Sequence, residues 1–149
     1  DEGLRAAAAE GFARIGTASD VGMLQKAFEG ERKMAPRLSQ AFALVNLGQN
    51  ATSEFAPLSY LVNTLNSKSY RGVALPFLVE LLRKRENREA VYTILPRATK
   101  EEKMQLAQAL SRSGQADSLA PLENRWKDGD SDVAQEAERA LRNLRARTT

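Results

Sequence analysis

The chain has 149 residues, of which 42% are hydrophobic, 28% charged and 6% aromatic, and its formal net charge is +3. This balance is too hydrophobic for intrinsic disorder and too evenly charged for a membrane protein, and the length is typical of one soluble domain. The absence of Cys and His excludes disulfides, thiolate catalysis, His-based triads, haem ligated by His and ordinary zinc sites. The 23 Ala and 19 Leu residues, against nine Gly and five Pro, favour helices. We therefore expect an all-α fold.

The first residues indicate a mature, soluble chain. Residues 1–5 lack the basic-then-apolar order of a signal peptide, and no segment approaches the ~20 apolar residues that span a bilayer. Because the chain has no initiator Met and a helical pattern begins almost at once, we expect a piece of a longer protein. The compartment stays open, with the cytoplasm preferred, and we expect the intact parent to be a monomer.

Apolar residues recur every three to four positions along most of the chain, which is typical of helices with one buried face. The pattern predicts nine helices, over residues 2–15, 19–29, 34–47, 53–66, 70–84, 87–95, 100–113, 117–127 and 131–145. In the first three helices, the residues assigned to the core are Leu4, Ala8, Phe12, Ile15, Val21, Leu24, Ala27, Phe28, Phe42, Val45 and Leu47.

A repeat of about 33 residues organises these helices. Gly16, Gly48 and Gly114 follow three similar Ala-rich segments and lie 32 and 66 residues apart. A degenerate copy covers residues 77–82, where Leu82-Arg83 replaces Leu-Gly, and residues 137–144 form a fifth, terminal copy. We expect each glycine to adopt the left-handed conformation that commonly ends a helix. For the degenerate copy, a bend, a partner contact and simple drift are all open explanations.

The segment after each glycine is also repeated. Residues 17–28 align without gaps with residues 115–126, and Ala56-Pro57-Leu58 recurs at 120–122, which leaves a two-residue insertion in the loop after Gly48. Each unit is therefore a helical hairpin, which buries its apolar face only by stacking on its neighbours. We expect a single domain over residues 1–149, with repeats at approximately 2–31, 32–68, 69–98 and 99–129 and a terminal helix at 130–147. In that helix, Ala137, Leu141 and Leu144 should face inward.

The motif of a unit is Arg-x-Ala-Ala-x-x-x-Phe/Leu-x-x-Ile/Leu-Gly, a polar turn, Val/Ala-x-x-Leu, and a link such as Asp-Gly-Asp-Ser-Asp at 128–132. It resembles the short bacterial HEAT repeats of the phycobilin-lyase type. The resemblance implies an α-solenoid of about four and a half HEAT-like hairpins, in which the second helices line the concave face. Ankyrin repeats share the period but need Thr-Pro-Leu-His, which this chain lacks because it has no His. Tetratricopeptide repeats are also disfavoured, because their Trp and Gly-x-x-Tyr are missing from the first helices.

The second helices supply the candidate binding surface. Their exposed positions form a ladder across the repeats, in which Tyr offers a large apolar area with a hydrogen-bonding tip. The ladder residues are Lys26, Glu29, Ser59, Tyr60, Asn63, Arg88, Tyr92, Asn124 and Lys127. In the alternative interpretation, Tyr60 and Tyr92 only cover a neighbouring turn. Trp126 aligns with Phe28 and is assigned to the core, whereas Arg125 either extends past the terminal helix or recognises a partner.

These observations predict a non-catalytic scaffold module, without a cofactor or metal, that binds a peptide or protein on the ladder. Glu101 and Glu102 are adjacent on a helix, and Asp130 and Ser131 are better explained as a helix cap than as acid–base groups. One alternative is nucleic-acid binding through the basic third repeat, with Lys84, Arg85, Arg88, Arg97, Lys100 and Lys103 as its residues. Another is an accessory subunit of a lyase-type enzyme, although nothing in the chain identifies a bilin site.

Overall fold

The computed structural model describes residues 1–125 and 129–148, and in this part of the chain it contains nine α-helices, three short 3-10 helices and no β-strand. The α-helices are α1 (Glu2–Ile15), α2 (Val21–Gly30), α3 (Met34–Asn46), α4 (Pro57–Thr64), α5 (Arg71–Leu81), α6 (Arg85–Ile94), α7 (Lys100–Ser113), α8 (Leu119–Arg125) and α9 (Ser131–Thr148). The predicted all-α class is confirmed, and helix ends agree with the sequence pattern to within a few residues. None of these helices is both long and apolar enough to cross a membrane.

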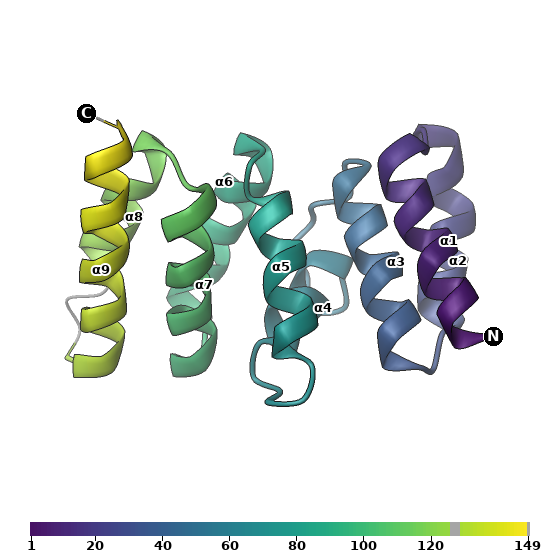
Figure 1. Cartoon of the computed structure of the whole chain (residues 1–149), viewed down its shortest axis with the longest axis horizontal. Helices are drawn as coiled ribbons and strands as arrows, with labels where there is room; N and C mark the ends of the chain where they lie inside the picture. Colours follow the sequence, from purple (N-terminus) through teal and green to yellow (C-terminus); the bar gives the residue numbers. More distant parts are fainter. Residues whose placement is uncertain (126–128, 149) are drawn as a thin grey trace.

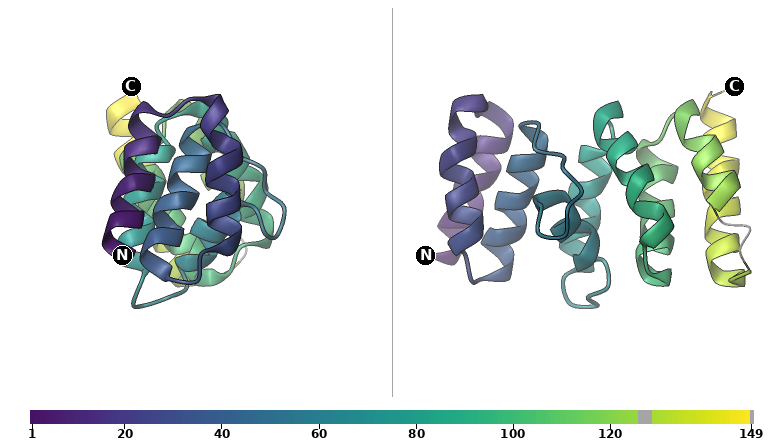
Figure 2. Two further views of the ribbon diagram at one scale, coloured as in Figure 1. Left: turned by 90° about the vertical axis from the view of Figure 1, so that its right-hand side faces the viewer. Right: turned by 180° about the vertical axis from the view of Figure 1, so that it is seen from behind.

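The helices stand in two rows along the long axis of the molecule, with the chain termini at opposite ends (Figure 1). The odd-numbered helices form one row, in which α1 contacts α3, α3 contacts α5, α5 contacts α7 and α7 contacts α9. The even-numbered helices form the second row, which faces the viewer when the molecule is turned by 180° (Figure 2). Because α2 and α4 pack mainly against α3, and α8 against α9, the odd row supplies most of the contacts between elements.

The core lies between the two rows and consists mainly of leucine. Leu38, Leu44, Leu58, Leu78 and Leu106 are all fully buried, and each such side chain contributes about 1.5–3 kcal/mol by leaving water. The core continues into α9, where the inward-facing residues predicted from the sequence are confirmed: Ala137 is 3% exposed, Leu141 4% and Leu144 0%. One core therefore runs the length of the described chain.

The prediction that the apolar stripe of α1 lies in the core was wrong for most of its length. Leu4 is 69% exposed and Ile15 is 85% exposed, and Ala8 is exposed as well. The buried residues of α1 are instead Ala9 and Ala13. The physical reason is that α1 ends the row, so only the face that meets α3 is covered.

The expected left-handed conformation occurs at Gly48, whose φ is +107°, but not at the other two repeat glycines. Gly16 and Gly114 have φ values of −70° and −68° and extended backbone. They need glycine for a different reason, which is space. A Cβ atom would lie 2.3 Å from the Phe12 carbonyl oxygen at Gly16, and 2.5 Å from that of Leu110 at Gly114. The glycine allows the chain to turn directly against the end of the helix.

Side chains of α6 replace the missing glycine in the degenerate third unit. After α5 ends at Leu81, the Asn87 side chain donates a hydrogen bond to the Leu81 carbonyl oxygen at 3.0 Å. The Arg88 guanidinium donates to the carbonyl oxygens of Leu82 and Arg83 at 3.1 and 2.9 Å. Because the last carbonyls of a helix lack intrahelical partners, these bonds satisfy the end of α5. The departure from the repeat motif is thus a capping arrangement.

The loop before α4 is longer than the sequence pattern predicted. The helix expected from residue 53 begins at Pro57, and Ala56 has the extended backbone (φ −70°, ψ 152°) that a residue before proline favours. Proline suits the first turn of a helix because its missing N–H has no partner there in any case. Residues 49–56 are consequently left outside the helix, where several of them border the groove described below.

Candidate functional site

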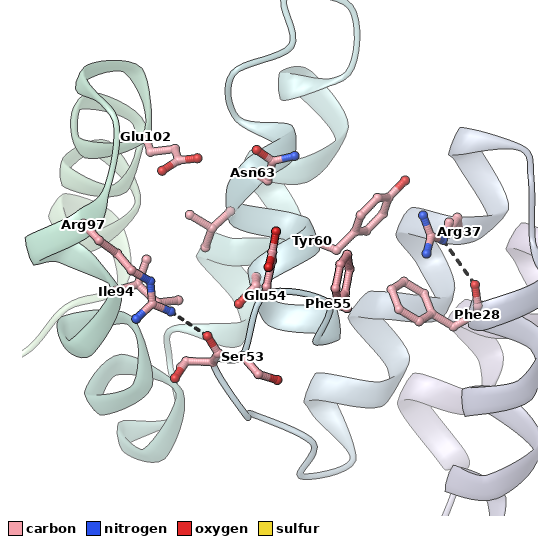
Figure 3. Close-up of a pocket in the computed structure, with 13 residues that line it drawn as sticks. Phe28, Arg37, Ser53, Glu54, Phe55, Tyr60, Asn63, Ile94, Arg97 and Glu102 are labelled. Carbon is pink, nitrogen blue, oxygen red and sulfur yellow. Dashed lines mark hydrogen bonds between the residues drawn. The ribbon is translucent and has the colours of Figure 1, made fainter.

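An open groove with a volume of about 820 Å³ lies over the even row, which is within the size range of small-molecule and peptide sites. It is bordered by α2, α4, the end of α6, the start of α7 and the loop before α4 (Figure 3). The lining residues are Phe28, Arg37, Thr52, Ser53, Glu54, Phe55, Ser59, Tyr60, Val62, Asn63, Ile94, Arg97 and Glu102. The groove joins residues of α2, α3, α4, α6 and α7 with the loop before α4.

One end of the groove is an aromatic cluster built around Arg37. The rings of Phe28 and Tyr60 meet edge to face at a centroid distance of 5.5 Å. The Arg37 guanidinium carbon lies 4.6 Å from both centroids, and its Nε donates to the Phe28 carbonyl oxygen at 3.2 Å. Both ring contacts fit cation–π attraction. Phe55, which is 83% exposed, lies beside this cluster and presents a large apolar ring to solvent.

The Tyr60 hydroxyl is neutral and half-buried. Burial raises its pKa above the ordinary value of 10.0, and the nearby Arg37 charge acts in the opposite direction. The hydroxyl donates to the Met34 sulfur at 3.3 Å, which is a weak bond. Tyr60 therefore packs against the protein and also borders the groove.

The other end of the groove is formed by Arg97 and Glu102. Arg97 donates to the Thr52 carbonyl oxygen at 2.5 Å, which ties the loop before α4 to the 3-10 helix Leu95–Arg97 that follows α6. Glu102 accepts a hydrogen bond from the Asn66 side chain at 2.7 Å and from the Thr99 N–H at 3.0 Å, in the capping box of α7. Glu54 lies between the two ends (Figure 3). The charged residues that line the groove are thus two arginines and two glutamates, namely Arg37, Arg97, Glu54 and Glu102.

The structure brings three of the predicted ladder residues together in this groove, namely Ser59, Tyr60 and Asn63. Lys26 instead lines a separate shallow depression with Arg5, and exposed Glu29 accepts a hydrogen bond from Gln25 at 3.0 Å. The side chain of Asn124, the side chain of Arg125 and all of Trp126 and Lys127 lie outside the described residues. The predictions for these four positions consequently remain predictions.

Arg88 and Tyr92, the two ladder residues of α6, belong to an internal cluster. Arg88 is only 5% exposed, so the prediction that it forms an exposed rung was wrong. Its Nε and Nη2 donate to the two Asp117 carboxylate oxygens, each at 3.0 Å. The Tyr92 hydroxyl donates to the same carboxylate at 2.6 Å and lies 2.5 Å from the Ser118 hydroxyl. The reason is that Arg88 caps α5 and at the same time pairs with Asp117 from the segment before α8.

The charges of this cluster stabilise one another. The Arg88 guanidinium lowers the pKa of the Asp117 carboxyl, and hydrogen bonding to Asp117 raises the pKa of Arg88. Burial, followed by the hydrogen bond to Asp117, raises the pKa of Tyr92. All three groups therefore keep their usual charge states at neutral pH, and the cluster links α6 to the segment before α8.

Most of the residues of the nucleic-acid alternative are also engaged within the chain. Lys84 donates to the Asn46 carbonyl oxygen at 2.9 Å, and Arg85 pairs with Glu89 at 2.9 Å. Lys100 pairs with Asp130 at 3.4 Å and with Asp132 at 2.9 Å. Arg88 is buried and Arg97 belongs to the groove, while Lys103 is half-buried on α7. The basic segment is thus divided among several local contacts.

Sequence reasoning missed Arg37, Glu54 and Phe55. Arg37 was overlooked because it lies on α3, a first helix of a unit, and only second helices were searched. The loop residues were overlooked because they were assigned to a helix. A signal was present, since an insertion after Gly48 carries Phe55, a lone aromatic residue in a polar loop.

The described residues contain no cluster of three or more His, Cys, Asp or Glu side chains that could hold a metal ion. Comparison of the chain with protein-family models, with curated proteins and with solved structures finds no significant match. Function is therefore inferred from the groove alone.

Proposed function

We propose that the chain is a non-catalytic interaction module that binds a peptide or protein segment in the groove over α2, α4 and α6. The observation that carries this proposal is the exposed Phe55 ring beside Tyr60, at the edge of an open groove. Aromatic side chains with a polar rim are typical of binding hot spots, because they bury a large apolar area with little loss of rotamer freedom.

The proposal includes the finer architecture, an α-solenoid of HEAT-like hairpins. Its support is the two-row arrangement together with the equivalent close turns at Gly16 and Gly114. The pairs α1–α2, α3–α4, α5–α6 and α7–α8 would be the hairpins, and α9 the terminal helix. Arrays of this kind bind extended partners along one row, because side chains from successive units line it at regular intervals.

Glu102, one of the two carboxylates that line the groove, is not placed for acid–base catalysis. General acid–base chemistry needs a carboxyl group that is free to exchange a proton with a substrate. Glu102 is instead 8% exposed and committed to the α7 cap and to Asn66. Of the two alternatives, nucleic-acid binding loses support because its basic residues are engaged within the chain. No contact among the described residues supports the accessory role in a lyase-type enzyme.

The test is selection of random peptides displayed on phage against the immobilised protein. Phe55→Ala is the groove variant, and Ile15→Ala is the matched control, since Ile15 is 85% exposed on α1 outside the groove. We expect selected peptides to bind the wild type and Ile15→Ala equally, and Phe55→Ala about tenfold more weakly, as for the loss of one hot-spot contact. Peptides that bind all three proteins equally would overturn the proposal, as would a selection that enriches no peptide.

A further inference from the structure

Two guanidinium groups of the groove have no acidic partner among the described residues. Arg37 stacks between Phe28 and Tyr60, and Arg97 donates to a backbone carbonyl oxygen. Six other arginines pair with a carboxylate, namely Arg5, Arg71, Arg85, Arg88, Arg139 and Arg145, whereas Arg37 and Arg97 both border the groove. A guanidinium held in place by stacking presents a rigid fork of donors that matches a carboxylate. The two groups are therefore suited to receive acidic groups from a ligand.

The order of charges along the groove limits which ligand fits. Figure 3 shows Arg97 on one side, Glu54 in the middle, Phe55 and Tyr60 next, and Arg37 beyond them. Glu102 adds a second carboxylate near Arg97. A continuous polyanion such as single-stranded nucleic acid would place phosphates against these carboxylates, and like charges repel. A ligand with separated acidic groups avoids this repulsion.

We infer that the groove recognises an extended peptide in which an aromatic or large apolar residue is flanked on both sides by Asp or Glu. This inference rests on the proposed function and adds the chemistry of the partner. The central side chain packs on Phe55 and Tyr60, one carboxylate pairs with Arg37, and the other pairs with Arg97. Stacking holds Arg37 in place before the peptide arrives, so little side-chain entropy is lost on binding.

The test uses a displayed nonapeptide library with Phe fixed at the centre and the other eight positions restricted to Asp, Glu, Asn, Gln, Ser and Gly. Asn and Gln match Asp and Glu in shape, so their relative enrichment reports charge alone. The baits are the wild type, Arg37→Met, Arg97→Met and Arg14→Met. Met keeps a long apolar stem against the aromatic rings, and Arg14 is an exposed arginine on α1 that serves as the matched control.

With the wild type and Arg14→Met, we expect acidic residues to be enriched several-fold over their amides on both sides of Phe. Arg37→Met should abolish the preference on one side and Arg97→Met on the other. Replacing one of the two acidic residues of a purified peptide by its amide should weaken binding to the wild type about tenfold, as for the loss of one charge-assisted hydrogen-bonded pair. This difference should shrink as salt rises.

Equal enrichment of acids and amides would overturn the inference, as would an acidic preference that persists in both groove variants. In either case, binding that still depends on Phe55 would leave the proposed function standing, so the two failures are distinguishable. A fluorescent 12-nucleotide oligothymidine tests the competing ligand. Arg37-dependent binding of this probe, tighter than that of the acidic peptides, would also overturn the inference in favour of a nucleic-acid site.

Discussion

Replacing Asp117 by Asn tests the contacts that place Arg88 inside the protein. The variant keeps the shape of the side chain and removes its charge, so Arg88 loses the group that neutralises it. Asp117 accepts two hydrogen bonds from Arg88 at 3.0 Å and one from Tyr92 at 2.6 Å. The Arg88 side chain is 6% exposed, whereas that of Asp117 is 22% exposed. The cation thus has little access to compensating water.

The expected loss is about 3 kcal/mol of unfolding free energy. Breaking a buried ion pair by removing one partner costs about 3–5 kcal/mol. We take the lower end for two reasons. Arg88 keeps its hydrogen bonds to the Leu82 and Arg83 carbonyl oxygens, and the partly exposed position of the Asp117 side chain admits some water to the new amide. For a chain of this size, a loss of about 3 kcal/mol lowers the melting temperature by roughly 6–12 °C.

Urea unfolding followed by circular dichroism at 222 nm measures this loss. The matched control is Glu89→Gln, which removes a carboxylate from the Arg85–Glu89 pair, where the two side chains are 70% and 59% exposed. It should leave stability unchanged within error, because exposed pairs contribute little. The double variant Arg88→Met/Asp117→Asn should lose less than the sum of the single variants Arg88→Met and Asp117→Asn, because either single change already breaks the pair. A loss below about 1 kcal/mol in Asp117→Asn would refute the buried charge pair as the stabilising element. Strictly additive losses in Arg88→Met, Asp117→Asn and the double variant would refute it as well.

Three further predictions concern acid stability, a repeat turn and the core. The pKa of Glu31 is lowered from its ordinary 4.5 to about 2, chiefly by its hydrogen bond from Arg5. The unfolded chain therefore binds more protons between these pH values, and stability should fall as the pH drops through this window, less steeply in Glu31→Gln. Gly114→Ala should cost about 1–3 kcal/mol, because its Cβ would lie 2.5 Å from a backbone oxygen. Phe42→Ala should cost about 3–5 kcal/mol, because the ring is 1% exposed.

Each of these predictions has a specific check. Urea midpoints measured from pH 2 to pH 7 should show a smaller change in Glu31→Gln than in the wild type, and parallel curves would contradict the assignment. Gly11→Ala, in the middle of α1 with nothing within 4 Å of the new Cβ, should stabilise by about 0.5–1 kcal/mol. Destabilisation by both glycine variants would argue against crowding at Gly114. Phe55→Ala should unfold at the wild-type urea concentration, because its ring is 83% exposed; a loss comparable to that of Phe42→Ala would contradict the groove.

The capping groups of the helices illustrate how far local sequence carries the fold. The Asp130 carboxylate accepts from the N–H groups of Asp132 and Val133 at 3.0 and 3.1 Å, as predicted for a cap of the last helix. In the structure, Pro57 begins α4 and the Thr99 capping box begins α7, although neither start was predicted from its capping residue. These features involve residues within a few positions of one another, so a sequence pattern contains all the interacting groups.

The groove was predicted only in part. Ser59, Tyr60 and Asn63 were found because alignment of the repeat copies marked their helix as a second helix with these positions exposed. Arg97 was assigned to a different kind of site, and Arg37 and Phe55 were not considered. The reason is that the groove joins residues distant in sequence, such as Arg97 and Thr52, which are 45 positions apart. No local pattern reports such a contact.

By itself, the sequence determined the helical class, the order of the helices and the inward face of the last helix, with Ala137, Leu141 and Leu144. These properties follow from apolar spacing and capping, which act over single helical turns. Only the tertiary structure decided that Arg88 is buried against Asp117, that α1 exposes Leu4 and Ile15, and that Gly114 is needed for space. Each of these outcomes depends on which neighbouring helix covers the residue. Packing between helices that are distant in sequence decides this, and no local pattern reports it.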